Sequence, residues 1–301
     1  MEMNNTISYI DRKSGEVVIE NPPGGGMLSL LYNSALGLVT LNTLVKRKFV
    51  SRFYGFLMER SWSSKLIKGF VEKYSINMSE FIVPVGGYVS FNQFFYRALK
   101  VGARKVSKGI VSPADGKVLA FENIDSNFSF HVKGITFNLE DFFQDKTLAS
   151  KYEGGNMTII RLAPDDYHRF HFPAKGEVDE TVNIKGDYLS VSPLALKSHL
   201  KTFSSNKRAY TNLKTNEFGD IGIIEVGSTM VGSIVQTSIS SNAVEAGEEK
   251  GYFKFGGSTI VLFFEKGKMS VAKDILKNTQ MGIETKVSMG ESIEHMDNQP
   301  F

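Results

Sequence analysis

The sequence predicts an α+β protein in which N-terminal amphipathic helices are followed by a mostly antiparallel β domain. Two observations carry this prediction. Apolar residues recur at helical spacing between residues 27 and 74, and short β-rich runs separated by glycines follow from about residue 115. With 301 residues, 42% of them hydrophobic and 22% charged, the chain can bury a full core. We place the division between a helical region, residues 1–80, and the main domain, residues 81–301, in the stretch 75–90.

Two or three amphipathic helices are predicted between Met27 and Tyr74. Basic residues lie between their apolar positions: Lys46, Arg47, Lys48, Arg52, Arg60, Lys65 and Lys68. Such helices either pack on the main domain or lie on an anionic bilayer surface, and the sequence leaves both open. The most apolar stretch, Met27–Val45, carries six Ser, Thr and Asn residues, which argues against a membrane-spanning helix. Residues 1–5 are acidic and polar, with no signal-peptide core behind them, so we expect an intracellular protein.

The rest of the chain is predicted to be rich in β-strands, after one more helix over residues 91–100. The strands are expected at Lys117–Phe121, Met157–Leu162, Ile221–Val226, Met230–Thr237 and Thr259–Phe264. Glycines between these runs indicate turns or bulges, and no internal repeat is present. A mostly antiparallel sheet follows from this pattern.

Composition limits the chemistry that the chain can perform. It has no cysteine, which excludes disulfides, thiolate nucleophiles and iron–sulfur clusters. The formal net charge of +3 favours anionic lipid or phosphate and is far from the strong basic bias of many nucleic-acid binders, so no nucleic acid is predicted as a partner.

Two of the five histidines, His168 and His171, lie in one short segment, Tyr167–Pro173. A metal site would need a third ligand at a characteristic spacing, and no HExxH pattern is present, so no metal is predicted. Histidines that only pack and hydrogen-bond in the core are the other interpretation. Asp115 lies in a proline–glycine turn, Ser112–Val118, that leads into a strand. A turn aspartate usually caps its own backbone, so alone it carries little weight.

Two Gly-Ser-Thr triplets contain the candidate nucleophiles Ser228 and Ser258. Neither lies in a Gly-x-Ser-x-Gly turn, which weighs against a conventional esterase. Ser258 follows a doubled glycine, Gly256-Gly257, and opens a strongly apolar run. Because glycine leaves its own carbonyl unshielded, Ser258 could attack the carbonyl of Gly257 if a histidine removed its proton.

Together these segments resemble the phosphatidylserine decarboxylase family of pyruvoyl-dependent enzymes. The resemblance rests on the order of several segments along most of the chain: Phe91–Arg97 with Ala103-Arg104, Ser112–Val118, Tyr167–Pro173, Gly186–Val191, Val231–Ile234 and Phe255–Leu262. Carried over residue by residue, it implies a self-processing triad of Asp115, His171 and Ser258. Because His171 would be committed to Ser258 in the precursor, His168, three residues before it, is the candidate for the acid that protonates the substrate carbanion.

The resemblance also implies a covalent pyruvoyl cofactor. Scission between Gly257 and Ser258 would give chains 1–257 and 258–301 and turn Ser258 into the pyruvoyl group. A Schiff base between that group and phosphatidylserine would then lead to phosphatidylethanolamine and carbon dioxide. The implied partner outside the protein is phosphatidylserine in an anionic membrane. The two cleaved chains are expected to form a heterodimer, and two such heterodimers are expected to form a homodimer. The implied location is peripheral, on the cytoplasmic side of the cell membrane.

Three positions qualify the resemblance. Ser228 stands in a stretch where the family usually has a small residue, so we interpret it as structural. Gly256 replaces the family's usual leucine, and Lys207 replaces a usual acid. Two other classes remain open at this stage: a serine hydrolase that uses Asp115, His171 and Ser258 on a separate substrate, and a non-catalytic lipid-binding module. Neither requires that the chain be cleaved.

Overall fold

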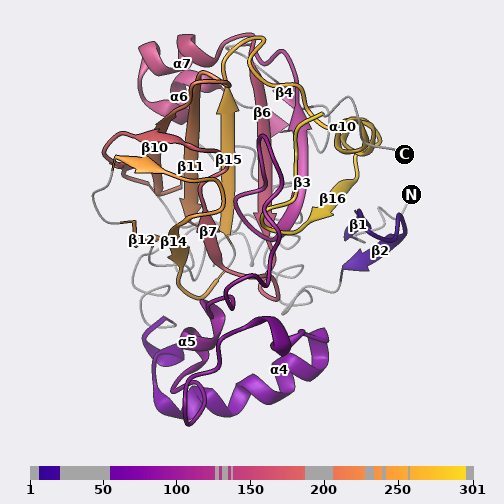
Figure 1. Cartoon of the computed structure of the whole chain (residues 1–301), viewed down its shortest axis with the longest axis vertical. Coiled ribbons are helices and arrows are strands. Elements are labelled where there is room, and N and C mark those ends of the chain that lie inside the picture. Colours follow the sequence, from indigo (N-terminus) through magenta and orange to yellow (C-terminus); the bar gives the residue numbers. More distant parts are fainter. Residues whose placement is uncertain are drawn as a thin grey trace, which may run out of the picture.

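The computed structural model describes residues 7–20, 55–125, 129–130, 135–136, 138–186, 206–227, 234–238, 242–256 and 258–295. Within these residues the α+β class is confirmed. Figure 1 shows a large sheet in the middle of the molecule, with helices α6 and α7 at one end and helices α4 and α5 at the opposite end. None of the helices in the described ranges is long and apolar enough to cross a bilayer.

The main sheet has eleven strands in the described part of the chain. Its order is β13 (Ala243–Val244), β8 (Gly176–Val178), β10 (Arg208–Lys214), β11 (Asp220–Gly227), β15 (Ser258–Phe264), β6 (Asn156–Leu162), β3 (Gly116–Phe121), β16 (Glu284–Val287), β1 (Ile7–Asp11) and β2 (Val17–Glu20), with β9 (Val182–Ile184) also paired to β10. All neighbours are antiparallel except β1 and β16, which are parallel. The predicted antiparallel character is therefore confirmed.

Side chains of the central strands alternate between two hydrophobic cores, one on each face of the sheet. On β15, Ile260 and Leu262 belong to one core, whereas Val261 and Phe263 belong to the other. The second core is closed by α6 (Leu139–Phe143) and α7 (Lys146–Tyr152). Because both faces are covered, these strands have the continuous apolar runs seen in the sequence.

The first core is closed by a second sheet and a helix. This sheet has the order β12 (Ile234–Gln236), β14 (Glu249–Phe253) and β7 (Arg169–His171), and the helix is α10 (Lys273–Gln280). A separate hairpin pairs β4 (Ser129–Phe130) with β5 (Ile135–Thr136). The second sheet matters for function, because β7 carries His171 and β14 leads toward Ser258.

A helical layer below the sheets contains the remaining elements. After a helical turn at residues 55–58 come η2 (Ser61–Lys65), α4 (Leu66–Tyr74), η3 (Met78–Glu80) and α5 (Phe91–Phe95). Met58, Phe91, Phe94 and Phe95 form its buried core. The part of the predicted helical region between residues 21 and 54 lies outside the described residues.

Some predicted boundaries were wrong. The helix expected over residues 91–100 ends at Phe95, because Leu99 forms a β-bridge with Phe81 and the Ala98 carbonyl accepts a hydrogen bond from the Ile82 N–H. The five predicted strands overlap β3, β6, β11, β12 and β15, although residues 230–233 of the fourth lie outside the described ranges. The other described strands, among them β1, β2, β10, β14 and β16, were not predicted.

Candidate active site

Ser258 is the first residue of β15 and is fully buried. Its backbone is fixed on both sides, since it pairs with Gly227 of β11 and with Leu162 of β6. Its Oγ has no hydrogen-bond partner. Buried hydroxyl groups normally find a partner, so an unpaired one on a rigid strand is a feature that requires an explanation.

His168 is completely buried in the segment that connects β6 to β7. Its Nδ1 lies 2.9 Å from the carbonyl oxygen of Asp166. Because a carbonyl only accepts, Nδ1 carries the hydrogen, and Nε2 is left with a lone pair and no partner. Burial lowers the pKa of His168 to about 3. The ring is therefore neutral at pH 7 and presents a buried proton acceptor.

The imidazole of His171, on β7, is held at both nitrogens. Nδ1 donates to the carbonyl of Gly247 at 2.9 Å, and Nε2 accepts from the hydroxyl of Tyr167 at 3.0 Å. Burial lowers the pKa of His171 as well. Nε2 is thus the basic nitrogen of this residue, and its orientation is fixed by Gly247.

Asp115 lies in the turn directly before β3. Its carboxylate accepts from the Met289 N–H at 2.7 Å and from the Arg104 guanidinium at 3.0 Å. Burial raises the pKa of Asp115, although both of these contacts act in the opposite direction. Arg104 also pairs with Glu80, so this basic side chain joins the helical layer to the Asp115 turn.

The structure shows no hydrogen bond among Asp115, His171 and Ser258, all of which are described. A backbone hydrogen bond links β7 to the turn that contains Asp115: the His171 N–H donates to the carbonyl of Pro113, two residues before Asp115, at 2.8 Å. Sequence reasoning missed Gly247 and Tyr167 as partners of His171. Tyr167 stood within the motif that carries the histidines, whereas no local signal marks Gly247.

A buried ion pair supports the segment that carries His168. The Lys117 ammonium, on β3, lies 3.0 and 2.8 Å from the two carboxylate oxygens of Asp166. Asp166 also accepts from the Ala163 N–H at 2.7 Å. Lys117 holds the pKa of Asp166 below its usual value, so the pair is charged. This fixes the Asp166 carbonyl that in turn orients His168.

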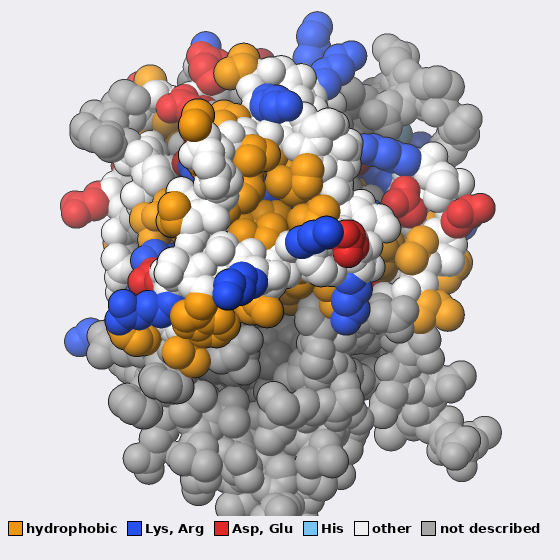
Figure 2. Space-filling model, turned by 90° about the horizontal axis from the view of Figure 1, so that it is seen from below, with side chains coloured by type: hydrophobic (Ala, Val, Ile, Leu, Met, Phe, Trp, Pro, Cys, Tyr) orange, Lys and Arg blue, Asp and Glu red, His pale blue; other side chains and the backbone are white. Residues whose placement is uncertain are grey.

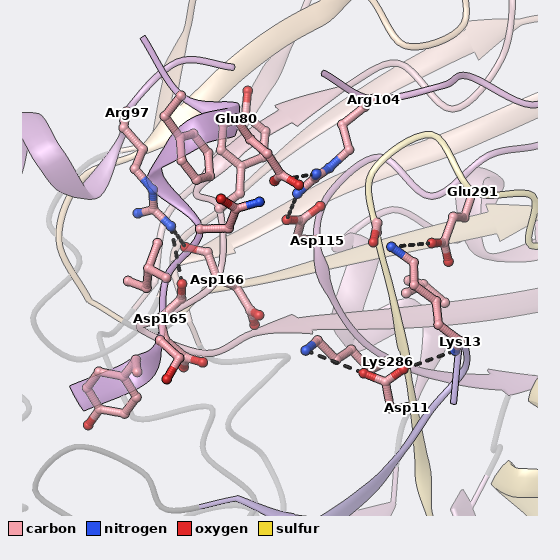
Figure 3. Close-up of a pocket in the computed structure, with 18 residues that line it drawn as sticks. Asp11, Lys13, Glu80, Arg97, Arg104, Asp115, Asp165, Asp166, Lys286 and Glu291 are labelled. Carbon is pink, nitrogen blue, oxygen red and sulfur yellow. Dashed lines mark hydrogen bonds and ion pairs between the residues drawn. The ribbon is translucent and has the colours of Figure 1, made fainter. Parts of the chain in front are cut away.

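A pocket of about 240 Å³ opens beside Asp115. Figure 3 shows Arg104 between Glu80 and Asp115 on one side of it, and Arg97 donating to the carbonyls of Asp165 and Asp166. Tyr167 also lines this pocket, but His168, His171 and Ser258 do not. The pocket therefore reaches the partners of the candidate groups rather than the groups themselves.

Several positions named from the sequence remain without a structural account. Ser228 and Gly257 lie outside the described residues. Lys207 shows only a backbone contact, its carbonyl accepting from the Gly227 N–H at 2.9 Å. Across the ranges that the structure describes, no group of three or more His, Asp or Glu side chains is placed to hold a metal ion.

An unpaired serine hydroxyl and two neutral, buried histidines are candidate groups for an enzyme of the nucleophile and acid–base class. Comparison with known proteins is specific. The family model described as phosphatidylserine decarboxylase matches residues 91–295. The phosphatidylserine decarboxylase proenzyme of Fusobacterium nucleatum subsp. nucleatum is 52% identical over 295 residues, which are 97% of this chain and 98% of that protein.

Proteins of the same name from Clostridium novyi and Ruminiclostridium cellulolyticum are 45% and 46% identical over 290 residues, which are 95% of this chain and 98% and 97% of theirs. The chain therefore belongs to the phosphatidylserine decarboxylase family, and it is a carboxy-lyase. This assignment removes the serine hydrolase and the non-catalytic lipid-binding module that the sequence had left open.

Proposed function

We propose that the chain is a proenzyme that cleaves itself between Gly257 and Ser258 and then decarboxylates phosphatidylserine to phosphatidylethanolamine. Its relatives are named phosphatidylserine decarboxylase proenzymes, which supports the substrate and the proenzyme form. The observation that carries the proposal is the Oγ of Ser258, which is fully buried, unpaired and placed at the start of a central strand.

In the proposed scission, Ser258 Oγ attacks the carbonyl carbon of Gly257 while a histidine takes its proton. The peptide bond is replaced by an ester, and the freed nitrogen of residue 258 takes a proton. Elimination then removes the proton from Cα of residue 258 and breaks the Cβ–O bond, so that the upstream chain leaves with a C-terminal carboxylate and residue 258 becomes dehydroalanine. Hydrolysis releases ammonia and leaves a pyruvoyl group on the downstream chain.

We propose His171 as the base and Asp115 as the residue that stabilises the resulting imidazolium. In the structure, Gly247 orients His171 and Arg104 engages Asp115. The triad thus requires the His171 ring to turn away from Gly247 and Tyr167 before it acts. Asp115→Asn should slow scission if this turn occurs, whereas scission of Asp115→Asn at the wild-type rate would leave Gly247 as the orienting group.

The residues around Ser258 fit the formation of a pyruvoyl group, because the Oγ, which leaves with the upstream chain, has no hydrogen bond to lose. When formed, such a group supplies a ketone that can react with an amine and accept the electrons released with carbon dioxide. We assign His168 to proton transfer at this stage. Since its Nε2 is a proton acceptor in the structure, it must first take up a proton before it can act as an acid.

Intact mass spectrometry of the purified protein tests the proposal. We expect two chains, residues 1–257 and 258–301, with the second lighter by one ammonia than its serine form. A single intact chain of 33.5 kDa in an active preparation would contradict it.

Variants identify the nucleophile and the base. Ser258→Ala and His171→Ala are expected to accumulate as uncleaved, inactive precursor, because one lacks the nucleophile and the other lacks its base. Ser228→Ala serves as the matched control from the other Gly-Ser-Thr triplet and is expected to be cleaved normally. If Ser258→Ala were cleaved and Ser228→Ala were not, Ser228 would be the nucleophile and Ser258 the structural serine.

We further propose that the helical layer places the enzyme on an anionic membrane. Figure 2, a view of the end that carries α4 and α5, shows hydrophobic side chains gathered together with Lys and Arg side chains around them. The exposed apolar residues of this layer include Phe56, Trp62, Leu66, Ile82, Val83, Val85 and Val89. Exposed apolar groups beside basic ones fit the interface of an anionic bilayer. The cytoplasmic side and the homodimer stay predictions.

Vesicle sedimentation tests the membrane proposal. Binding to vesicles that contain phosphatidylserine should exceed binding to neutral phosphatidylcholine vesicles and should weaken with salt, because charges are screened beyond about 8 Å at physiological ionic strength. Trp62→Ser combined with Val85→Ser should reduce binding. Ile19→Ser, which changes an exposed residue of β2 at the edge of the main sheet, is the control. Equal binding by all three proteins would place the membrane surface elsewhere.

A further inference from the structure

The residues that precede Ser258 are held by helix α5 of the helical layer. They lie in the short connection from β14, which ends at Phe253, to β15, which begins at Ser258. The Phe255 N–H donates to Oδ1 of Asn92, on α5, at 2.9 Å. This hydrogen bond joins segments 163 residues apart and lies three residues before the proposed nucleophile.

The amide of Asn92 is itself fixed in one orientation. Asn92 is only 2% exposed, and its Nδ2 donates to Oε1 of Glu59 at 3.3 Å. The same carboxylate oxygen accepts from the ammonium of Lys254 at 2.7 Å. Two consecutive residues of the connection, Lys254 and Phe255, are therefore bound to the helical layer through one small network of polar side chains.

Aromatic packing reinforces this network. The ring of Phe255 lies 5.3 Å from that of Phe91 and 4.8 Å from that of Phe95, measured between centroids. Phe95 also contacts the ring of His168, with centroids 3.8 Å apart. One face of α5 therefore touches both the segment before Ser258 and one of the two candidate histidines.

Gly256 changes the direction of the chain directly after this anchor. Its φ of +139° lies in a region that residues with a Cβ rarely adopt. On the other side of the proposed scissile bond, Ser258 is fixed by its strand pairing. The chain is thus held at Phe255 and again at Ser258, with only two glycines between these points.

We propose that Asn92 is a positioning residue for self-cleavage, which fixes Phe255 so that the carbonyl of Gly257 is presented to Ser258 Oγ. The inference rests on the proposed self-cleavage. Attack by a neighbouring group needs reacting atoms about 3–3.5 Å apart and correctly aligned, and a misplacement of about 1 Å can cost about a hundredfold in rate. Holding the chain at Phe255, directly before Gly256-Gly257, supplies that alignment.

The test is the rate of precursor scission, followed on denaturing gels after synthesis of the full chain in a cell-free system. Asn92→Leu has a similar size but cannot accept the hydrogen bond, and we expect scission to slow by about tenfold to a hundredfold. Asn92→Asp keeps an acceptor for the Phe255 N–H, although it places a carboxylate against Glu59, and should restore most of the rate when combined with Glu59→Gln.

Gln93 provides a matched control on the same helix. Its side-chain oxygen also accepts from a backbone N–H, that of Val89, but this bond does not involve the segment before Ser258. Gln93→Leu should therefore cleave at the wild-type rate. Melting temperatures, measured for each change in the uncleavable Ser258→Ala background, show whether the variants fold.

The outcomes separate this inference from the proposed function. Wild-type protein that never cleaves contradicts the proposed function itself. Normal cleavage of a folded Asn92→Leu variant, or equal slowing by Gln93→Leu, overturns only the role of Asn92. If Asn92→Leu does not fold, the ion pair between Glu59 and Lys254 provides a second test of the same network. If Glu59→Lys slows scission and the added change Lys254→Glu restores the rate, the role of the network in positioning the chain is supported. Scission of Glu59→Lys at the wild-type rate overturns that role.

Discussion

At the scale of single residues, the site is defined by polar atoms that the fold has isolated from water. Ser258 Oγ and His168 Nε2 are both buried and both unpaired. Leaving such groups without partners costs stability, and proteins keep that cost at positions where chemistry occurs. For His168 the effect of burial can be measured as a pH dependence of the free energy of unfolding, because its protonation is coupled to folding.

The pKa of His168 predicts how stability depends on pH. Burial lowers it from 6.5 to about 3, so the folded protein binds this proton less readily than the unfolded chain. The stabilising contribution is complete above pH 6.5 and is lost as the pH falls toward 3. At pH 5.5 the loss should be on the order of 1 kcal/mol. His171, whose pKa is also lowered, acts in the same direction.

Urea unfolding of the uncleavable Ser258→Ala chain at pH 7.5 and 5.5 measures this effect. His168→Asn keeps a donor for the Asp166 carbonyl but cannot titrate, so its stability should fall less over the same interval, by on the order of 1 kcal/mol. Identical losses in the two proteins would mean that His168 is protonated in the folded state at pH 5.5.

Which site residues could be predicted from the sequence depends on how local their signals are. Asp115, His168, His171 and Ser258 stand in short motifs whose order along the chain is distinctive. Their partners are different. The carbonyl of Gly247 orients His171 from 76 residues away, and a backbone carbonyl has no signature in the sequence. The roles proposed for the four motif residues stay predictions, because a structure at rest does not show the reaction.

At the scale of elements, the four central strands β11, β15, β6 and β3 were predicted, whereas β10 and β16 on either side of them and the hairpin at the edge were not. The strands β6, β11 and β15 are buried on both faces and therefore appear as continuous apolar runs. The hairpin of β1 and β2 has exposed residues such as Val17 and Ile19 and lies at the end of the sheet. Its place there depends on parallel pairing of β1 with β16, across most of the chain.

A buried ionic cluster attaches that hairpin to the sheet. The Arg161 guanidinium, on β6, contacts the carboxylates of Glu284 on β16 and Glu20 on β2, at 2.7 and 2.6 Å. Replacing Arg161 by leucine would leave two buried carboxylates without a counterion. We expect the free energy of unfolding of the Ser258→Ala chain to fall by about 3–5 kcal/mol in urea titrations.

The comparison for this prediction is an exposed ion pair. Lys175 and Glu245 lie 2.7 Å apart, but both side chains are mostly in solvent. Lys175→Ala should change the free energy of unfolding by less than about 1 kcal/mol. Similar small losses for Arg161→Leu would indicate that Glu20 and Glu284 reach water when their partner is removed.

At the scale of the whole molecule, the proposed scission divides the chain without dividing the fold. Residues 258–301 contain β15, α10 and β16. β15 lies between β11 and β6 and all of its residues are buried, while β16 lies between β3 and β1. The other strands of the sheet all belong to residues 1–257. The short chain therefore supplies two interior strands of a sheet whose remaining strands come from the long chain.

This arrangement predicts that the two mature chains stay together after scission. Removing the short chain would break the pairing of β15 with both neighbours and expose both hydrophobic cores, so dissociation requires unfolding of the sheet. On gel filtration in native buffer, the two chains should elute together at the same volume as the Ser258→Ala precursor. They should separate only in concentrated denaturant. Release of the 258–301 chain in native buffer, with the long chain still folded by circular dichroism, would contradict the central position of β15.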